Sequence, residues 1–205
     1  NQLLKFREIL DTMEYLPPCI HTSNSAAAMR YPDAFFNTIR LGISMYGLSP
    51  SPEIANELPV SLKPALALYT KVKQIKRIDA GDTVGYGATY EAEEPEWIAT
   101  LPIGYADGWI RKLSGQSVLI IGKRAPIVGR ICMDQCMVKV DQYVPEDSLV
   151  TLIGSDGDEC ITVDEIADKL ETINYEVVCQ LSGRIPRVYI QDGSIVQTVN
   201  QLFRF

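Results

Sequence analysis

Residues 19–42 read CIHTSNSAAAMRYPDAFFNTIRLG, and their pattern decides the fold class of the first part of the chain. Residues 19–21 and 38–41 are short strand candidates, and residues 22–25 offer several helix-capping side chains ahead of the alanine-rich residues 26–29. A strand, a loop, a helix and a second strand thus follow one another. This order is typical of an α/β unit with parallel strands.

The segments on either side of this unit differ from each other. On the N-terminal side, apolar residues recur at helical spacing from Leu3 to Met13 and predict a helix that ends before Pro17. On the C-terminal side, residues 48–61 are irregular and rich in proline and serine. We therefore expect a domain boundary there, with one domain over residues 1–60 and a second over residues 61–205.

After this boundary the pattern is mostly that of β-strands. Apolar residues alternate from Leu66 to Val72, and the phase then slips, which a bulge near Lys73 would explain. Asp192 and Gly193 form a hairpin turn between the two strand candidates that close the chain. Further strand candidates are residues 97–103, 117–121, 125–132, 136–140 and 149–153.

One helix interrupts this β region. Thr162 and Glu165 form a capping box, and Ile166, Leu170 and Ile173 are spaced as the buried stripe of the helix. The sequence therefore predicts the end of an α/β domain, followed by a β-rich domain with one helix.

Composition and charge exclude several classes of protein. The 205 residues carry 26 acidic and 19 basic side chains, a net charge of −7, which disfavours a nucleic-acid partner. No apolar run approaches the ~20 residues of a membrane helix, and the start does not resemble a signal peptide. Five cysteines, an odd number, favour free thiols in a reducing cytosol over a disulfide framework, so we expect a cytoplasmic protein.

Histidine chemistry has little scope, because His21 is the single histidine in the chain. A metal site is therefore not expected, and proton transfer must rely on tyrosine, lysine, carboxylates or a cofactor. Residues 21–25 and 40–43 could form an anion cradle from a helix start and a glycine loop. The plainer interpretation is that Asn24 and Ser25 only cap a helix.

Three further motifs bring reactive side chains into glycine-rich turns. Tyr86 and Tyr105 each lie beside glycines, which let the backbone bend sharply and hold a ring forward for acid–base work. Alternatively, each ring only anchors a turn. Residues 129–135 could face a substrate, or Arg130 and Asp134 could form a buried structural pair. Together these features suggest proton transfer at a phosphate-bearing cofactor.

Five blocks of the sequence resemble successive motifs of the bacterial alanine racemase family. They are HTSNSA (21–26), RLGISMYG (40–47), GYGATY (85–90), IGYADG (103–108) and GRICMDQ (129–135), in that family's order and spacing. The likeness extends from about Pro18 to Tyr189. It implies an α/β-barrel tail plus a mainly-β domain. These would be the last strands and helices of a (β/α)8 barrel that holds pyridoxal 5'-phosphate (PLP), then a β-rich C-terminal domain with one helix.

The resemblance also implies a role for particular residues. Tyr86 matches a catalytic base that acts on the L-enantiomer, and Met133 matches the residue whose backbone contacts the substrate carboxylate. Arg40 matches the arginine at the pyridine nitrogen, and His21 matches its hydrogen-bond partner. The full set of cofactor-binding matches is His21, Asn24, Ser25, Arg40, Gly42, Ile43 and Tyr175. The matches at the substrate entrance are Tyr105, Arg111, Arg130 and Ile173.

By the same resemblance, the protein is a portion of a racemase that interconverts L- and D-alanine by two-base proton transfer on a PLP aldimine. It would supply D-alanine for peptidoglycan, and its active sites would be shared between the subunits of a homodimer. The family's Schiff-base lysine, which is the other base, has no match in this sequence. We therefore expect a truncated chain that is inactive alone.

Other functions fit the same architecture. A PLP-dependent amino-acid decarboxylase shares it, but places an acidic residue at the pyridine nitrogen where Arg40 stands here. A non-catalytic β module for dimerisation is a further alternative. Within the racemases, the sequence does not separate alanine from serine as the substrate.

Overall fold

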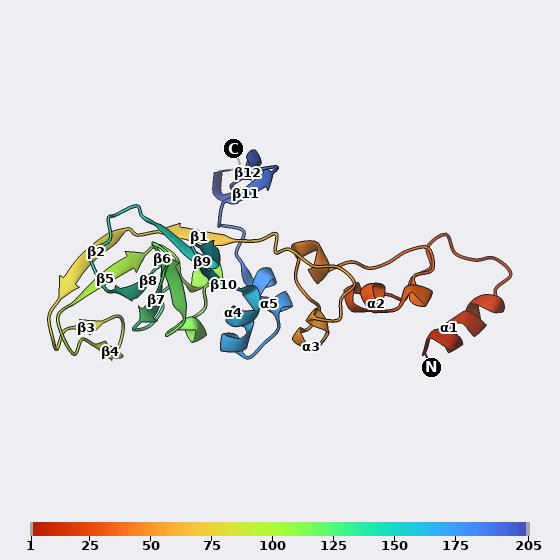
Figure 1. The fold of residues 1–205 in the computed structure, drawn as a ribbon, viewed down its shortest axis with the longest axis horizontal. Coiled ribbons are helices and arrows are strands. Elements are labelled where there is room, and N and C mark those ends of the chain that lie inside the picture. The colour runs from red at the N-terminus through yellow and green to blue at the C-terminus, as the bar shows by residue number, and fades with distance from the viewer. Residues whose placement is uncertain (1, 204–205) are drawn as a thin grey trace. The chain divides into compact units, whose positions relative to one another are not determined.

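The computed structural model describes residues 2–203. The chain divides into two compact units, residues 1–66 and residues 67–205, whose elements are labelled in Figure 1. Asn1 and residues 204–205, at the outer ends of the two expected domains, lie outside the described residues. Each unit has its own set of contacts.

The first unit consists of short helices joined by irregular segments. Its elements are α1 Gln2–Asp11, α2 Ser25–Arg30, η1 Pro32–Ala34, η2 Ile43–Tyr46 and α3 Pro52–Ala55, where η denotes a 3-10 helix. The two helices expected from the sequence are confirmed as α1 and α2. Asn24 caps α2 by accepting a hydrogen bond from the Ala27 amide at 2.9 Å.

The two strands expected beside α2 are reduced to a single parallel bridge between Asn24 and Arg40. The Arg40 amide donates to the Ser23 carbonyl at 2.9 Å, so the parallel direction is as expected. The prediction of short strands over residues 19–21 and 38–41 is wrong. Within the described part of the first unit no third strand lies beside them, and an unsupported pair of short parallel strands forms few ladder hydrogen bonds.

The second unit is built on one eight-stranded sheet with the order β1-β9-β6-β7-β8-β5-β2, and β10 pairs with β9. Its strands are β1 Leu68–Lys71, β2 Gln74–Ile78, β5 Glu96–Leu101, β6 Ser117–Ile120, β7 Lys123–Val128, β8 Cys136–Val140, β9 Leu149–Asp156 and β10 Glu159–Ile161. Neighbouring strands run antiparallel. The β-rich character expected for this part of the chain is therefore confirmed.

Two hairpins and a few helical segments complete the second unit. The hairpins are β3 Thr83–Val84 with β4 Tyr90–Glu91, and β11 Arg187–Gln191 with β12 Ser194–Val199. The helical segments are η3 Tyr105–Asp107, η4 Arg111–Leu113, α4 Val163–Leu170, α5 Asn174–Gln180 and η5 Gln201–Phe203. The Asp192-Gly193 turn of the closing hairpin is confirmed, and α5 is a helix that the sequence pattern did not reveal.

The expected bulge near Lys73 is instead a break between two separate strands. β1 pairs with β9, whereas β2 pairs with β5 at the opposite end of the strand order. The Val72 amide donates to the Ser148 carbonyl at 3.0 Å, and the Lys73 amide donates to the Thr100 carbonyl at 2.9 Å. The apolar phase slips here because the chain passes from one edge strand to the other.

Ile173 does not belong to the buried stripe of α4. The helix ends at Leu170, and Glu171 follows in the left-handed conformation with φ 57°. Ile173 is 59% exposed and precedes α5. The stripe prediction was wrong at this position because a left-handed residue reverses the chain where the sequence still shows helical spacing.

Strand β8 buries alternate side chains, and an apolar cluster holds the β3–β4 hairpin on the sheet. In β8, Cys136, Val138 and Val140 are buried in strict alternation. The cluster consists of Ile78, Val84, Ala92, Ile98 and Val128, with Tyr90 and Met137 packed against it. Residues of strands β2, β5 and β7 thus pack against the hairpin.

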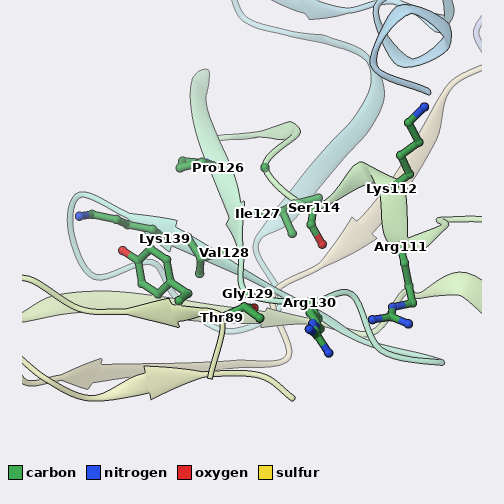
Figure 2. A pocket seen from close by; sticks show the side chains of 12 residues that line it. Thr89, Arg111, Lys112, Ser114, Pro126, Ile127, Val128, Gly129, Arg130 and Lys139 are labelled. Atoms are coloured by element: carbon green, nitrogen blue, oxygen red, sulfur yellow. The ribbon is translucent and has the colours of Figure 1, made fainter. Parts of the chain in front are cut away.

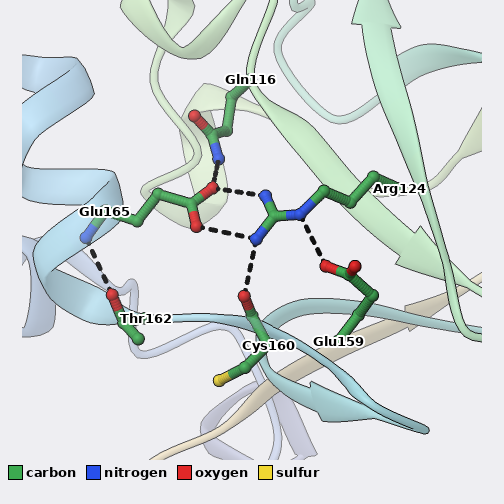
Figure 3. A network of polar contacts seen from close by, with 6 residues as sticks. All are labelled: Gln116, Arg124, Glu159, Cys160, Thr162 and Glu165. Atoms are coloured by element: carbon green, nitrogen blue, oxygen red, sulfur yellow. Dashed lines mark hydrogen bonds and ion pairs between the residues drawn. The ribbon is translucent and has the colours of Figure 1, made fainter.

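Arg124 of β7 anchors α4 to the sheet through several charged hydrogen bonds (Figure 3). Its Nη1 and Nη2 donate to Glu165 of α4 at 2.9 and 3.1 Å, and its Nε donates to Glu159 of β10 at 2.8 Å. Nη2 also donates to the Cys160 carbonyl at 2.7 Å, and Gln116 Nε2 donates to Glu165 at 2.6 Å. These bonds lower the pKa of the Glu165 carboxyl below its usual value.

Gly104 brings two loops into backbone contact. A Cβ placed on Gly104 would lie 2.3 Å from the Cys132 carbonyl oxygen and 2.6 Å from the Met133 carbonyl. The Tyr105 amide donates to the Cys132 carbonyl at 3.0 Å, and the Ala106 amide donates to the Met133 carbonyl at 2.8 Å. Gly104 is extended, with φ −153°, a conformation that any residue can adopt. Glycine is required here because a side chain would clash with the neighbouring backbone.

The apolar side chains of the β11–β12 hairpin lie outward, with Ile190 67% and Ile195 68% exposed. Among the helices of residues 2–203, none combines the length and the apolar character that crossing a bilayer requires.

The first prediction concerns the pH dependence of stability. Because the pKa of Glu165 is lowered in the fold, its contribution is present above the unfolded value of about 4.3 and is lost as the pH falls below it. Glu165→Gln should lower the free energy of unfolding by about 1 kcal/mol at pH 7, since the pair is partly exposed. The loss should shrink towards pH 3.5 in urea titrations. Glu146→Gln, at an exposed glutamate, is the control, and a pH-independent loss would contradict the assignment.

The second prediction compares two glycines at which an added Cβ would lie equally close to its nearest neighbour, 2.3 Å away. Gly104→Ala should destabilise the protein by about 2 kcal/mol, because its methyl group meets backbone atoms that cannot move aside. Gly183→Ala should cost under about 0.5 kcal/mol, because its Cβ meets only the flexible end of the Gln201 side chain, also at 2.3 Å. Chemical denaturation measures both, and comparable losses would contradict the rigid backbone contact.

Candidate active site

The first unit gathers its six candidate residues around the start of α2. Ser25 is 3% exposed, and its Oγ accepts a hydrogen bond from the Gly42 amide at 2.9 Å. This bond joins the helix start to the loop that opens η2. Because the hydroxyl accepts from Gly42, its own proton is left for another acceptor, such as an anion. Within residues 2–203 the Ile43 amide has no acceptor either. The Ser25 hydroxyl and the Ile43 amide are therefore two available donors at this junction.

Arg40 lies against His21 beside this junction. Arg40 Nη1 is 2.8 Å from His21 Nδ1, and Nη2 is 3.4 Å from the Thr22 carbonyl oxygen. A guanidinium only donates hydrogen bonds, so His21 Nδ1 accepts and the ring carries its proton on Nε2. The histidine thus fixes the direction of the guanidinium within the anion cradle, which we define as residues 21–25 and 40–43.

Tyr86 lies at the tip of the β3–β4 hairpin in the second unit and is 74% exposed. Gly85 and Gly87 on either side have φ 78° and 75°, a region that favours glycine and lets the loop turn tightly. A Cβ on Gly87 would lie 3.3 Å from the Arg130 guanidinium. A cation therefore packs against the loop that presents the tyrosine.

Tyr86 shares a cavity of about 420 Å³ with the turn that carries Met133. Cys132 and Gln135 line this cavity, and the Cys132 amide donates to the Gln135 carbonyl at 2.8 Å to close the turn. Met133 is 56% exposed on the turn, and Tyr105 is 42% exposed on the loop that Gly104 packs against it. The second unit thus brings the loops of Tyr86, Tyr105 and Met133 together.

Arg111 and Arg130, both expected at the substrate entrance, line an open cavity of about 690 Å³ (Figure 2). Lys112 and Lys139 also line it, and none of the described lining residues is acidic. Lys112 pairs with Glu171 and Lys139 with Glu96, so the basic character of this groove comes from Arg111 and Arg130. The alternative of a buried Arg130–Asp134 pair is wrong, because both side chains are exposed and no ion pair joins them in the described part of the chain.

Ile173 and Tyr175 form a third group at the start of α5, and neither lines the two cavities. Burial raises the pKa of the half-buried Tyr175, so its hydroxyl stays a protonated donor. The segment after α5 contacts the Tyr105 loop, since the Ser182 amide donates to the Asp107 carbonyl at 3.0 Å. Asp107 also pairs with Arg184 at 2.9 Å.

Sequence reasoning missed a buried carboxylate between the hairpin and the sheet. The Tyr90 hydroxyl donates to Glu96 Oε1 at 2.6 Å, and Lys139 Nζ lies 2.6 Å from Glu96 Oε2. Glu96 is 6% exposed. The sequence does show an acidic residue directly before an apolar strand. Its partners could not be identified from this local pattern, because Tyr90 lies six positions before Glu96 and Lys139 lies 43 positions after it.

The site chemistry is that of hydrogen-bond donors and tyrosines. The anion cradle offers backbone amides, a hydroxyl and a guanidinium, which suit a phosphate and an unprotonated ring nitrogen. Burial raises the pKa of Cys136 to about 12, which makes this thiol a poor nucleophile. The described residues contain no group of three or more His, Cys, Asp or Glu side chains placed to hold a metal ion.

Two family matches cover most of the chain. Residues 1–50 match the alanine racemase N-terminal domain, and residues 65–189 match the alanine racemase C-terminal domain. The second match alone extends over more than half of the chain.

Individual relatives agree with the family matches. The alanine racemase of Geobacillus kaustophilus is 49% identical over 203 residues, which is 99% of this chain and 53% of that protein. The crystal structure of Bacillus anthracis alanine racemase with bound L-Ala-P superposes with a TM-score of 0.94 at 49% identity, covering 97% of this chain and 52% of that one. A histidine racemase from Leuconostoc mesenteroides superposes with a TM-score of 0.85 at 33% identity, covering 93% of this chain and 51% of that one. The chain thus spans about half the length of these relatives, and it belongs to the alanine racemase family.

Proposed function

We propose that this chain supplies the end of the PLP-binding (β/α)8 barrel and the β-rich C-terminal domain of an alanine racemase. In this proposal residues 1–60 belong to the barrel and residues 61–205 to the second domain. The enzyme interconverts L- and D-alanine in the cytoplasm and provides D-alanine for peptidoglycan. The observation that carries the proposal is the hydrogen-bonded set of donors around Ser25 and Arg40, in a chain of this family.

The residues of the anion cradle fit a phosphate-bearing pyridine cofactor. Ser25 Oγ and the Ile43 amide would hold the phosphate, with Asn24 beside them. Tyr175 is assigned to phosphate binding on its match to the family alone. The Gly42 amide is already bonded to Ser25 Oγ, so we assign Gly42 to fixing that hydroxyl as well as to the phosphate loop. All of these groups donate hydrogen bonds, as a dianion requires.

Arg40 would face the ring nitrogen of the cofactor, and His21 would hold it there. When bound, PLP supplies the electron sink that stabilises negative charge at the substrate Cα. A guanidinium does not give up its proton in proteins, so Arg40 donates a hydrogen bond to the ring without protonating it. A weaker sink of this kind favours a short-lived carbanion and limits transamination. A decarboxylase would need an acidic residue at this position.

Proton transfer would use two bases on opposite faces of Cα. Tyr86 removes the α-proton of L-alanine or returns it, and the family's Schiff-base lysine does so on the D side. That lysine belongs to the half of the relatives' length that this chain does not span, so we propose that the chain is inactive alone. The Met133 amide would bind the substrate carboxylate. Both residues would serve the barrel of a partner subunit in a homodimer.

The entrance would be formed by Tyr105, Arg111, Arg130 and Ile173. Two of its residues, Arg111 and Arg130, line the basic groove, which suits a substrate that carries a carboxylate. Alanine is the proposed substrate, because the relatives of higher identity are alanine racemases. A racemase of another amino acid is the second candidate, since the histidine racemase shares the fold. Assay of purified enzyme against alanine, serine and histidine separates them.

The third prediction tests the base assignment in the complete enzyme that carries both family domains. Racemisation itself has an equilibrium constant of one, so kcat/KM must be equal in both directions. Exchange of the α-proton with deuterated solvent does not have this constraint. Tyr86→Phe should slow exchange from L-alanine by at least about a hundredfold, and exchange from D-alanine much less.

Nuclear magnetic resonance at early times measures both exchange rates. Wild-type enzyme and Tyr143→Phe, which removes a hydroxyl from an exposed tyrosine of the same unit, provide the reference. Equal slowing of the two enantiomers would count against Tyr86 as the L-side base.

A further inference from the structure

The β3–β4 hairpin that carries Tyr86 is too short to position it by strand pairing. Each strand has two residues, and the pairs are Thr83 with Glu91 and Val84 with Tyr90. A two-stranded hairpin is marginal without further support. The loop between the strands also contains three residues with positive φ, namely Gly85, Gly87 and Ala88. Its direction therefore depends on what anchors the two strand ends.

Apolar packing supports one side of the hairpin. Val84 belongs to the cluster with Ile78, Ile98 and Val128, and Gly129 lies so close that its Cβ would be 2.5 Å from the Val84 carbonyl oxygen. These contacts hold the hairpin against the sheet. Apolar packing is not directional, so it does not by itself fix the orientation of the loop that carries Tyr86.

The Tyr90 hydroxyl supplies a directional contact. It donates to Glu96 Oε1 at 2.6 Å, a side-chain hydrogen bond that joins the hairpin to the sheet. Glu96 begins β5, and its side chain is 4% exposed. A buried carboxylate needs partners for its charge, and Lys139 of β8 provides one at 2.6 Å. Tyr90 thus ends a fixed chain of three groups that spans two sheet strands and the hairpin.

The protonation states agree with this arrangement. Burial and the hydrogen bond to Glu96 raise the pKa of Tyr90, so its hydroxyl remains a donor. The hydrogen bond to Glu96 raises the pKa of Lys139, so the ammonium stays charged. The Tyr90 hydroxyl therefore donates to a side chain that the Lys139 ammonium also contacts, and hydrogen bonds within such charged networks are short and directional.

We propose that Tyr90, Glu96 and Lys139 are positioning residues that orient the Tyr86 loop for proton transfer on the L face of the substrate. The inference rests on the proposed role of Tyr86. None of the three touches the reacting atoms in this account. Tyr90 is the first residue of β4, and its Cα pairs with Val84, two residues before Tyr86. A loss of the anchor therefore reaches Tyr86 directly and leaves the D-side base untouched.

The test is the ratio of α-proton exchange rates from L- and D-alanine in the complete enzyme loaded with PLP. Tyr90→Phe removes one hydroxyl and should slow exchange from L-alanine by about fivefold, the equivalent of one hydrogen bond, with less than about twofold change for D-alanine. Tyr143→Phe is the matched control, because Tyr143 packs its ring on Trp97 and is 55% exposed. It should leave both rates unchanged.

A second pair of variants keeps the proposal testable if Tyr90→Phe does not fold. Lys139→Met leaves Tyr90 in place but leaves Glu96 without its ion pair, and should lower the L-to-D exchange ratio in the same direction. Lys139→Arg retains the charge and should restore the ratio. A general loss of stability would slow both enantiomers alike, so equal slowing, or no change in the ratio, would overturn the proposal.

Tyr86→Phe, measured in parallel, separates this proposal from the proposed function. If Tyr86→Phe slows L-alanine selectively and Tyr90→Phe does not, the anchor is wrong and the base assignment stands. If Tyr86→Phe is not selective, the base assignment fails, and the anchor proposal that depends on it fails as well.

Discussion

Backbone packed directly on backbone is the constraint on which the second unit depends. At Gly104 the Tyr105 loop lies on the carbonyls of Cys132 and Met133, and at Gly129 the chain lies on the carbonyl of Val84. At each place a methyl group would come within 2.3 to 2.5 Å of a carbonyl oxygen. The Tyr105 loop and the turn that carries Met133 are therefore in direct backbone contact, and the strand that leads into the Tyr86 loop is held in the same way at Val84.

Charge is arranged differently in the two units. The first unit places donors around Ser25 and directs the Arg40 guanidinium by means of His21. The second unit pairs buried carboxylates with cations at Glu96 and Asp107, and gathers further cations in the groove of Arg111 and Arg130. The first arrangement suits the binding of a phosphate-bearing cofactor. The second holds loops in place and attracts a carboxylate. The proposed division of labour between cofactor binding and proton transfer follows from these two patterns.

Much of this could be predicted from local sequence. Helical spacing and capping residues identified α1, α2 and α4, and alternation identified the core strands, because these signals depend on neighbours within a few positions. The short parallel strands failed, since a strand needs partners that a local pattern does not reveal. The break at Lys73 looked like a bulge for the same reason. Ile173 was misplaced because one left-handed residue, Glu171, interrupts a periodicity that the sequence continues.

The individual residues of the candidate site could be predicted from the sequence, but the contacts between them could not. Glycine-flanked tyrosines and the cap of α2 are visible as motifs, whereas the anchor of Tyr90 on Glu96 and Lys139 joins residues from β4, β5 and β8. Likewise, only the structure shows that the Gly42 amide is bonded to Ser25 Oγ. Long-range pairing of this kind is fixed by the sheet order, which a local reading of one sequence does not supply.

We propose that Tyr86 of one subunit acts at the Arg40 site of another. Mixing two crippled variants of the complete enzyme, Tyr86→Phe and Arg40→Glu, tests it most directly. If sites are shared, half of the randomly formed dimers are mixed and each has one intact site, so roughly a quarter of wild-type activity returns after subunit exchange. If each site is built from one subunit, every site in the mixture carries a substitution, and the absence of recovered activity would contradict the account.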